Sequence, residues 1–217
     1  RLSDIILGGQ DGLVNVLGVM LGVVAATQNS RIVIAAGLAA TFAESVSMGA
    51  VAFTSTSAET SHYDSEKARE YRHVEKVPEL EKEEIYDIYR DKGFEGELLD
   101  KVVETITSNK DVWVSEMMSN EHDMAPQHSD KHLSTAIIVF VSAMVGSLIP
   151  ITPYFFLPIG ISTVLSLLVS ALTLYGVGYY KAKQTVGDAG KSGWQMTAIG
   201  MTSAFVGFIV GWFFRAP

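Results

Sequence analysis

Cysteine is absent from the 217 residues of this chain, which excludes disulfide bonds, thiolate metal sites and cysteine nucleophiles. Any soft metal ligand must therefore be a methionine or a histidine. The sequence also lacks a glycine-rich phosphate-binding loop, a triad-like arrangement of catalytic residues and a basic patch for nucleic acid. We therefore expect no ATP-driven step, no enzyme activity, no organic cofactor and no nucleic-acid partner.

Charged residues are scarce outside one central segment. Between Glu59 and His132 lie 20 of the 24 Asp and Glu residues, 10 of the 16 Lys and Arg residues and all five histidines. This segment carries a formal charge of about −10. The only acids in the rest of the chain are Asp4, Asp11, Glu44 and Asp188. No soluble fold needs so few charges, so we expect the flanking regions to lie in a membrane.

Five apolar stretches are long enough to cross a bilayer, for which a helix needs about 20 residues. They cover residues 5–27, 32–56, 133–151, 154–180 and 194–214, and the last three contain no charged residue. A buried soluble helix would show a polar face at a period of 3.6 residues, and these stretches show none. We predict an all-α integral membrane protein. Its predicted parts are transmembrane helices 1 and 2 in 1–57, a helical insert in 58–132 and transmembrane helices 3 to 5 in 133–217.

The short loops indicate the orientation of these spans. Lys181, Lys183 and Lys191 lie on the same side as the insert and the N-terminus. Loops rich in Lys and Arg face the cytosol. We therefore expect a cytosolic insert and a C-terminus on the opposite side.

Two acids, Asp11 and Glu44, lie inside the first two predicted spans, where an ionised carboxylate costs about 2.5–3.5 kcal/mol on insertion scales. Met48 should lie about as deep as Asp11, with Glu44 one turn deeper on the same face as Met48. Oxygen ligands combined with a thioether favour Fe²⁺, Co²⁺ or Zn²⁺ over Mg²⁺ or Ca²⁺. We predict a translocation path along Asp11, Glu44 and Met48. The alternatives are a lipid-facing or packing role for Met48 and a structural hydrogen-bond site at Asp11.

The insert is expected to form three helical regions. The first continues out of the second span to about Lys76. Pro78 opens the second region and Gly93 closes it. The third region covers residues 95–124, with a break near Asn109.

Candidate metal ligands follow helical spacing in each region of the insert. Stripes of carboxylate, imidazole and thioether groups that converge would bind several divalent ions, although an acidic stripe is most often a solvated helix face. The adjacent methionines are the clearer signal, because exposed thioethers contribute little to solubility. The candidates are His62, Glu66, Glu70 and His73 in the first region, Glu81 and Glu84 in the second, and Met117, Met118 and Glu121 in the third.

Five motifs, in order along the chain, resemble those of the vacuolar iron transporter family, whose members export Fe²⁺ from the cytosol into a storage compartment in exchange for protons. The resemblance covers essentially the whole chain, including the insert. The motifs are Ser3-Asp4-Ile5, Asp11-Gly12-Leu13, Met48-Gly49, His62-Tyr63, and Trp113 with Met117-Met118.

The resemblance implies a homodimer with the ion path between two copies of the first transmembrane helix. It implies that Asp11 and Met48 belong to the translocation site. The expected partners are a second copy of the chain, the lipid bilayer, divalent metal ions and protons, and the expected location is a vacuolar or equivalent storage membrane. The ligands implied for a cytosolic metal-binding domain are Glu70, Glu81, Glu84, Met117, Met118 and Glu121.

Two positions depart from the family pattern. Ala40 stands where the family has a translocation-site glutamate, and Glu44 lies one turn, or about 5.4 Å, nearer the cytosol. We expect Glu44 to take over that role. His73 stands where the insert pattern has a glutamate, and imidazole protonates near pH 6.5, so metal occupancy of the insert should fall more steeply on acidification.

The leading hypothesis is a secondary transporter that moves Fe²⁺, with Mn²⁺, Co²⁺ and Zn²⁺ as further candidate substrates. A membrane-tethered ferroxidase is a rival, because Glu59-x-x-His62 and Glu70-x-x-His73 match the Glu-x-x-His element of di-iron bundles. That architecture needs the two elements on different helices, and here both fall on one. A passive metal channel with a metal-sensing insert also stays open, and proton counter-movement would distinguish it from a transporter.

Overall fold

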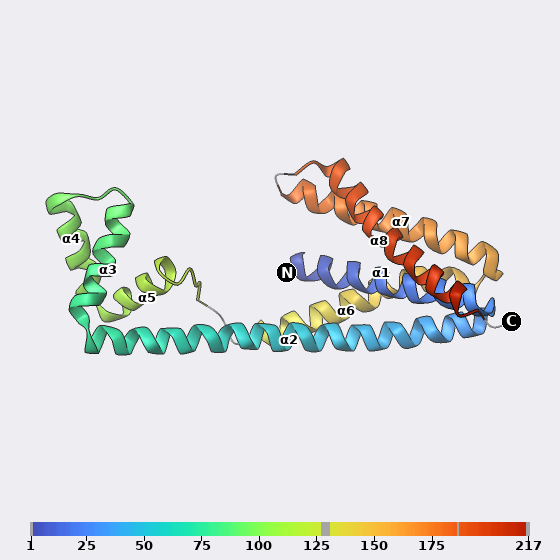
Figure 1. Ribbon diagram of the computed structural model, residues 1–217, viewed down its shortest axis with the longest axis horizontal. Helices are drawn as coiled ribbons and strands as arrows, with labels where there is room; N and C mark the ends of the chain where they lie inside the picture. Colours follow the sequence, from blue (N-terminus) through green and yellow to red (C-terminus); the bar gives the residue numbers. More distant parts are fainter. Residues whose placement is uncertain (1, 127–130, 186, 216–217) are drawn as a thin grey trace. The chain divides into compact units, whose positions relative to one another are not determined.

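The computed structural model describes residues 2–126, 131–185 and 187–215, and every regular element in them is helical, as predicted (Figure 1). In chain order the elements are α1 (Leu2–Thr27), α2 (Ser30–Lys76), α3 (Pro78–Asp91), α4 (Gly96–Thr107), α5 (Lys110–Asn120), α6 (His132–Ile151), the short 3₁₀ helix η2 (Thr152–Phe155), α7 (Ile159–Gln184) and α8 (Ala189–Phe213).

Five helices are long and apolar enough to cross a membrane, in agreement with the five predicted spans. They comprise α1, α2, α6 with η2, α7 and α8. Large apolar side chains on these helices point outward, including Leu172 and Phe213, which are 72% and 77% exposed. Such exposure is costly in water and favourable in lipid, so the chain is a multi-pass membrane protein.

The chain forms two compact units. The membrane unit comprises residues 1–53 and 132–217, and the insert unit comprises residues 54–131. The predicted limits of the insert were 58–132. The boundary at Thr54 lies within α2, which continues without a break to Lys76.

In the membrane unit, α1 packs against α6, α7 and α8 (Figure 1). Glycines allow this packing, because small residues let helix backbones approach closely in lipid. A Cβ on Gly146 would overlap the carbonyl oxygen of Gly9, and one on Gly211 would overlap that of Gly22. These two contacts fix α1 against α6 on one side and against α8 on the other.

In the insert unit, α4 contacts both α3 and α5 (Figure 1). Hydrogen bonds from tyrosines connect the helices at their edges: Tyr71 Oη donates to Asp111 at 2.7 Å, and Tyr89 Oη donates to Glu116 at 2.7 Å. The shared core consists of Tyr63, Val74, Ile85, Leu99, Val103, Ile106, Trp113, Val114, Met117 and Met118.

The third region of the insert departs partly from the sequence prediction. The predicted break is confirmed at Asn109, whose side chain caps α5 by accepting hydrogen bonds from the backbone N–H groups of Asp111 and Val112. The predicted helical end at Met124 is wrong, because α5 ends at Asn120. Beyond it Asp123 has a φ of +52°, a left-handed conformation that cannot continue an α-helix.

Candidate metal sites

Two acidic side chains meet in the membrane unit. The carboxyl groups of Asp11 on α1 and Glu44 on α2 lie within hydrogen-bonding reach of one another. Asn15, one turn along α1 from Asp11, donates from Nδ2 to Glu44 Oε1 at 2.9 Å. Two carboxyl groups and one amide from two helices therefore converge within the apolar spans, and this arrangement can hold a proton or a cation.

The residues beside Glu44 on α2 differ in character. Ala40, one turn toward the N-terminal end, packs against an apolar cluster that includes Val16 and Met20 of α1. Met48, one turn in the other direction, is half-buried, and Gly49 next to it contacts Phe140 of α6. Glu44 thus lies between the apolar contact at Ala40 and the thioether of Met48 along α2.

Open space lies beside Asp11 and Asn15. A cavity of about 160 Å³ is bordered by Asp11 together with Gln10 and Val14. A second cavity, of about 480 Å³, is bordered by Asn15 and by Gly18 and Gly22 of α1 with residues of α8. Neither polar side chain is therefore enclosed in a packed core.

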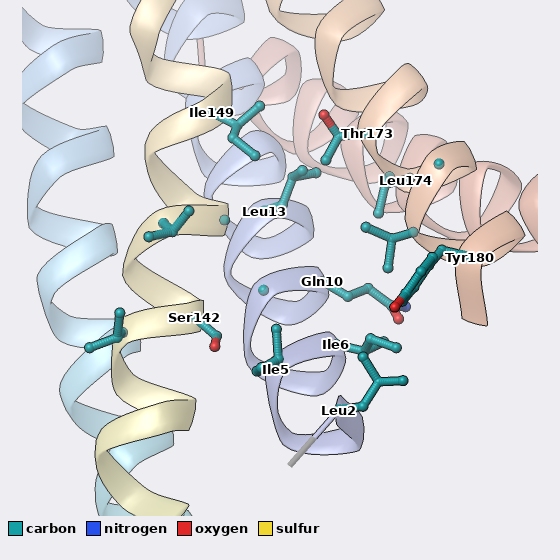
Figure 2. Close-up of a pocket in the computed structure, with 16 residues that line it drawn as sticks. Leu2, Ile5, Ile6, Gln10, Leu13, Ser142, Ile149, Thr173, Leu174 and Tyr180 are labelled. Atoms are coloured by element: carbon teal, nitrogen blue, oxygen red, sulfur yellow. The ribbon is translucent and has the colours of Figure 1, made fainter. Parts of the chain in front are cut away.

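A larger cavity of about 520 Å³ lies among α1, α6 and α7 and has a different character (Figure 2). Leu13, Ile149 and Leu174 contribute to an almost wholly apolar wall, with Gln10 and Tyr180 at one end (Figure 2). Asp11 and Glu44 do not line it. It offers no set of donor groups for a metal ion.

The insert unit contains a first group of candidate ligands, which joins α2 to α3. His73 Nδ1 lies 3.3 Å from Glu81 Oε1 and 3.9 Å from Glu70 Oε1. One ligand atom from each of these three residues falls within 4.8 Å of the others. The sequence prediction named all three.

A second group shares Glu70 with the first. His122 Nε2 lies 3.1 Å from Glu70 Oε1 and 3.9 Å from Glu121 Oε2. Ligand atoms from these three residues also fall within 4.8 Å of one another. His122 was not predicted as a ligand. It lies beyond the end of α5, so helical spacing does not align it with the other candidates, and its only signal in the sequence is its position next to Glu121.

The shared carboxylates are almost fully buried. Glu70 and Glu81 are each 2% exposed, and the Oε2 atom of each has no hydrogen-bond donor among the described residues. The guanidinium nitrogen Arg69 Nε lies 3.7 Å from the other oxygen of Glu70, Oε1. An unpaired buried carboxylate is strongly unfavourable, so these oxygens need a proton or a cation.

Burial and mutual repulsion also perturb the acids of the insert. Burial, followed by the charges of Glu84, Glu70 and Glu121, raises the pKa of Glu81 from 4.5 to about 7. Burial and the charges of Glu121 and Glu70 raise the pKa of Glu84. Buried carboxyl groups that repel one another in this way form an environment that a divalent cation would stabilise.

The remaining candidates in the insert occupy different environments. Met117 and Met118 are 0% and 1% exposed and belong to the insert core, so the expectation that they are exposed thioethers is wrong. His62 is exposed, and Glu66 forms an ion pair with Arg69 at 2.7 Å. Both lie outside the two ligand groups found among the described residues, and their role as ligands stays a prediction.

Comparison with known proteins places these features in a family. Residues 2–212 match the model of the VIT family. The chain is 30% identical over 200 residues to vacuolar iron transporter 1 of Tulipa gesneriana, covering 92% of this chain and 81% of that protein. It is 31% identical over 208 residues to vacuolar iron transporter 2 of Oryza sativa subsp. japonica, covering 95% and 85%. It is 32% identical over 221 residues to the vacuolar iron transporter of Plasmodium falciparum (isolate 3D7), covering 97% and 81%. These relatives are named as transporters and not as enzymes, and the chain belongs to the VIT family.

Proposed function

We propose that this protein is a secondary transporter that moves Fe²⁺ out of the cytosol into a vacuole-like compartment in exchange for protons. The observation that carries the proposal is the Asp11–Glu44 pair within the membrane-spanning helices. The names of the relatives, which are vacuolar iron transporters, support iron as the substrate and the vacuolar membrane as the location. Mn²⁺, Co²⁺ and Zn²⁺ are further candidate substrates.

The chemistry of the pair supports exchange of a metal ion for protons. Two carboxylates at hydrogen-bonding distance cannot both stay ionised in an apolar environment without a compensating charge. A shared proton supplies that charge in one state, and a divalent cation supplies it in the other. Binding of the cation therefore displaces protons, and release of the cation takes protons up again.

Glu44 fills the role of the glutamate that is missing at Ala40. Asn15 donates to Glu44 Oε1, which orients this carboxyl group toward Asp11 while leaving Oε2 for other partners. Met48 lies one turn away on α2 and would add a thioether ligand next to the pair. This combination of oxygen and sulfur ligands favours Fe²⁺ over Mg²⁺ or Ca²⁺.

A homodimer through α1 would complete the path. Leu7 and Val19 on α1 are 59% and 44% exposed, and they border the same cavities as Asp11 and Asn15. A second copy of α1 against this face would enclose the polar groups between two subunits. The half-open surroundings of Asp11 support this arrangement.

The insert would capture metal on the cytosolic side, as the basic short loops suggest. Its two ligand groups offer carboxylates and imidazoles that a divalent ion can bind, and they share Glu70. Glu84, whose carboxyl group interacts with that of Glu121, would add an oxygen ligand. Met117 and Met118 belong to the insert core and would have to turn toward the ion in the metal-bound state to complete the set. Metal concentrated in this way would then enter the path at Asp11 and Glu44.

The test is Fe²⁺ uptake into proteoliposomes with an acidic lumen and the insert outside. Uptake should accelerate when the lumen is made acidic, and Glu44→Gln should abolish the acceleration. Asp91→Asn, which removes an exposed acid at the end of α3, is the matched control and should transport normally. Unchanged transport by Glu44→Gln would remove Glu44 from the mechanism, and uptake that ignores the pH gradient would favour a passive channel. Oxygen consumption on addition of Fe²⁺ would instead favour the ferroxidase.

A further inference from the structure

The transport proposal gives His122 no role of its own beyond its place in the second ligand group. Its Nε2 atom lies 3.1 Å from Glu70 Oε1, and its side chain is 15% exposed. The carboxylate that it faces is 2% exposed. An imidazole held against an almost fully buried carboxylate is either a donor that positions Glu70 or a metal ligand that shares an ion with it.

The backbone after α5 fixes this position. The N–H groups of Glu121 and His122 both donate to the carbonyl oxygen of Met117, at 3.0 and 3.3 Å. The N–H of Met124 donates to the carbonyl oxygen of Met118 at 2.9 Å, and the backbone of Asp123, just before Met124, is left-handed. The chain therefore folds back over the end of α5, and His122 is held toward α2 instead of following the helix outward.

A role as hydrogen-bond donor alone leaves the surrounding charge unbalanced. His122 can satisfy Glu70 Oε1, but the Oε2 atoms of Glu70 and Glu81 still have no donor among the described residues. These two carboxyl groups face one another. Glu70, Glu81 and Glu121 all take part in the two ligand groups, and Arg69, whose Nε lies 3.7 Å from Glu70 Oε1, brings a single positive charge to them. A divalent ion would neutralise more of this negative charge.

We propose that His122 is a metal ligand and that it determines the metal preference of the insert. With His122 bound, each of the two groups contains one imidazole, His73 in the first and His122 in the second, and Glu70 belongs to both. Imidazole suits Zn²⁺, Co²⁺ and Fe²⁺, whereas a site made only of oxygen ligands suits Mn²⁺ and Mg²⁺. The insert therefore selects Zn²⁺, Co²⁺ and Fe²⁺ over Mn²⁺. This inference rests on the proposed capture of metal by the insert.

The first test is the ratio of Zn²⁺ to Mn²⁺ affinity, measured by equilibrium competition on the full-length protein in detergent. His122→Gln keeps a side-chain N–H that can donate to Glu70, so the fold is retained while the imidazole is lost. Loss of an outer-shell partner of a metal site costs about 10–100-fold in affinity, so loss of a direct ligand should weaken Zn²⁺ binding at least about tenfold. Mn²⁺ binding should change less than about threefold. His132→Gln, which removes the imidazole at the start of α6, is the control and should keep the wild-type ratio.

The second test uses the absence of cysteine from the chain. In His122→Cys the new thiolate should bind added Co²⁺ and produce a sulfur-to-cobalt charge-transfer band in the near ultraviolet, whereas His132→Cys should produce none. A residue that only positions Glu70 gives no such band, and its replacement by Gln leaves the Zn²⁺/Mn²⁺ ratio unchanged. Those two results would overturn the assignment of His122 while leaving metal capture intact. If the wild-type protein binds neither ion, metal capture by the insert and the role of His122 both fail.

Discussion

The two units both remove carboxylates from water, but they compensate for the cost in different ways. In the membrane unit, Asp11 and Glu44 are half-buried, Asp11 borders a cavity, and Asn15 donates an amide hydrogen bond to Glu44. In the insert unit, Glu70 and Glu81 are almost fully buried and have oxygens that face no donor among the described residues. The first arrangement suits an ion that arrives and leaves, and the second suits an ion that stays longer.

The stability of the two units has different origins as well. Close backbone contacts at glycines join the membrane helices in addition to their apolar side-chain clusters, whereas the insert is held together by one core of apolar side chains. Changes in one unit should therefore leave the other largely intact.

The largest effect is expected from the carboxyl pair of the membrane unit. Asp11→Asn should reduce proton-driven metal uptake by at least about tenfold, equivalent to about 1.4 kcal/mol, because the pair then has one ionisable group instead of two. Combining it with Glu44→Gln should reduce uptake no further than the worse single variant, since the two residues act as a unit. Initial rates in proteoliposomes measure both quantities. Additive losses would show that the two carboxyl groups work separately.

A substitution in the insert core should destabilise the insert strongly and leave the membrane unit folded. Ile85→Ala should destabilise the insert by about 2–5 kcal/mol, because Ile85 is 0% exposed and its removal leaves a cavity. Limited proteolysis should then cut within residues 54–131 while α6 to α8 stay protected. Val112→Ala, at an exposed position on α5, should change stability by less than about 0.5 kcal/mol. Simultaneous loss of both units in Ile85→Ala would contradict their independence.

A smaller effect is expected from pH in the metal-free protein. The folded pKa of Glu81 is about 7 and its ordinary value is 4.5, so between these values the folded protein binds more protons than the unfolded chain. Stability therefore falls as the pH rises from about 4.5 to about 7, and added Zn²⁺ or Fe²⁺ should restore it. Trp113 fluorescence reports unfolding of the insert when the exposed Trp194 and Trp212 are replaced by Phe. In Glu81→Gln the pH dependence should weaken, and a metal-free insert that gains stability over this pH range would contradict the account.

Much of the fold could be predicted from the sequence, because the length and hydropathy of a membrane span are local properties. The five spans, Pro78 at the start of α3 and the break at Asn109 all follow from residues within a few positions of each feature. The predicted helical end at Met124 is wrong. The backbone is left-handed at Asp123, and because this residue is not a glycine, the sequence gives no sign of the turn.

The candidate sites could be predicted less completely, because they depend on contacts between helices. Helical spacing identified Glu70, His73 and Glu81, which lie on faces that meet. It could not identify His122, which lies past a helix end, nor the direct meeting of Asp11 with Glu44, which depends on how α1 and α2 are rotated against one another. The burial of Met117 and Met118 was also missed, because the polar residues around them in the sequence lie on the opposite face of α5.

The central claim, that the Asp11–Glu44 pair exchanges protons for metal, is tested most directly by recording lumenal pH and Fe²⁺ uptake together in proteoliposomes. Fe²⁺ entry into an acidic lumen should be accompanied by alkalinisation of that lumen in the wild-type protein. In Glu44→Gln the acidic lumen should no longer accelerate Fe²⁺ entry, and the alkalinisation should disappear. Fe²⁺ entry at the wild-type rate with no change in lumenal pH would contradict the account.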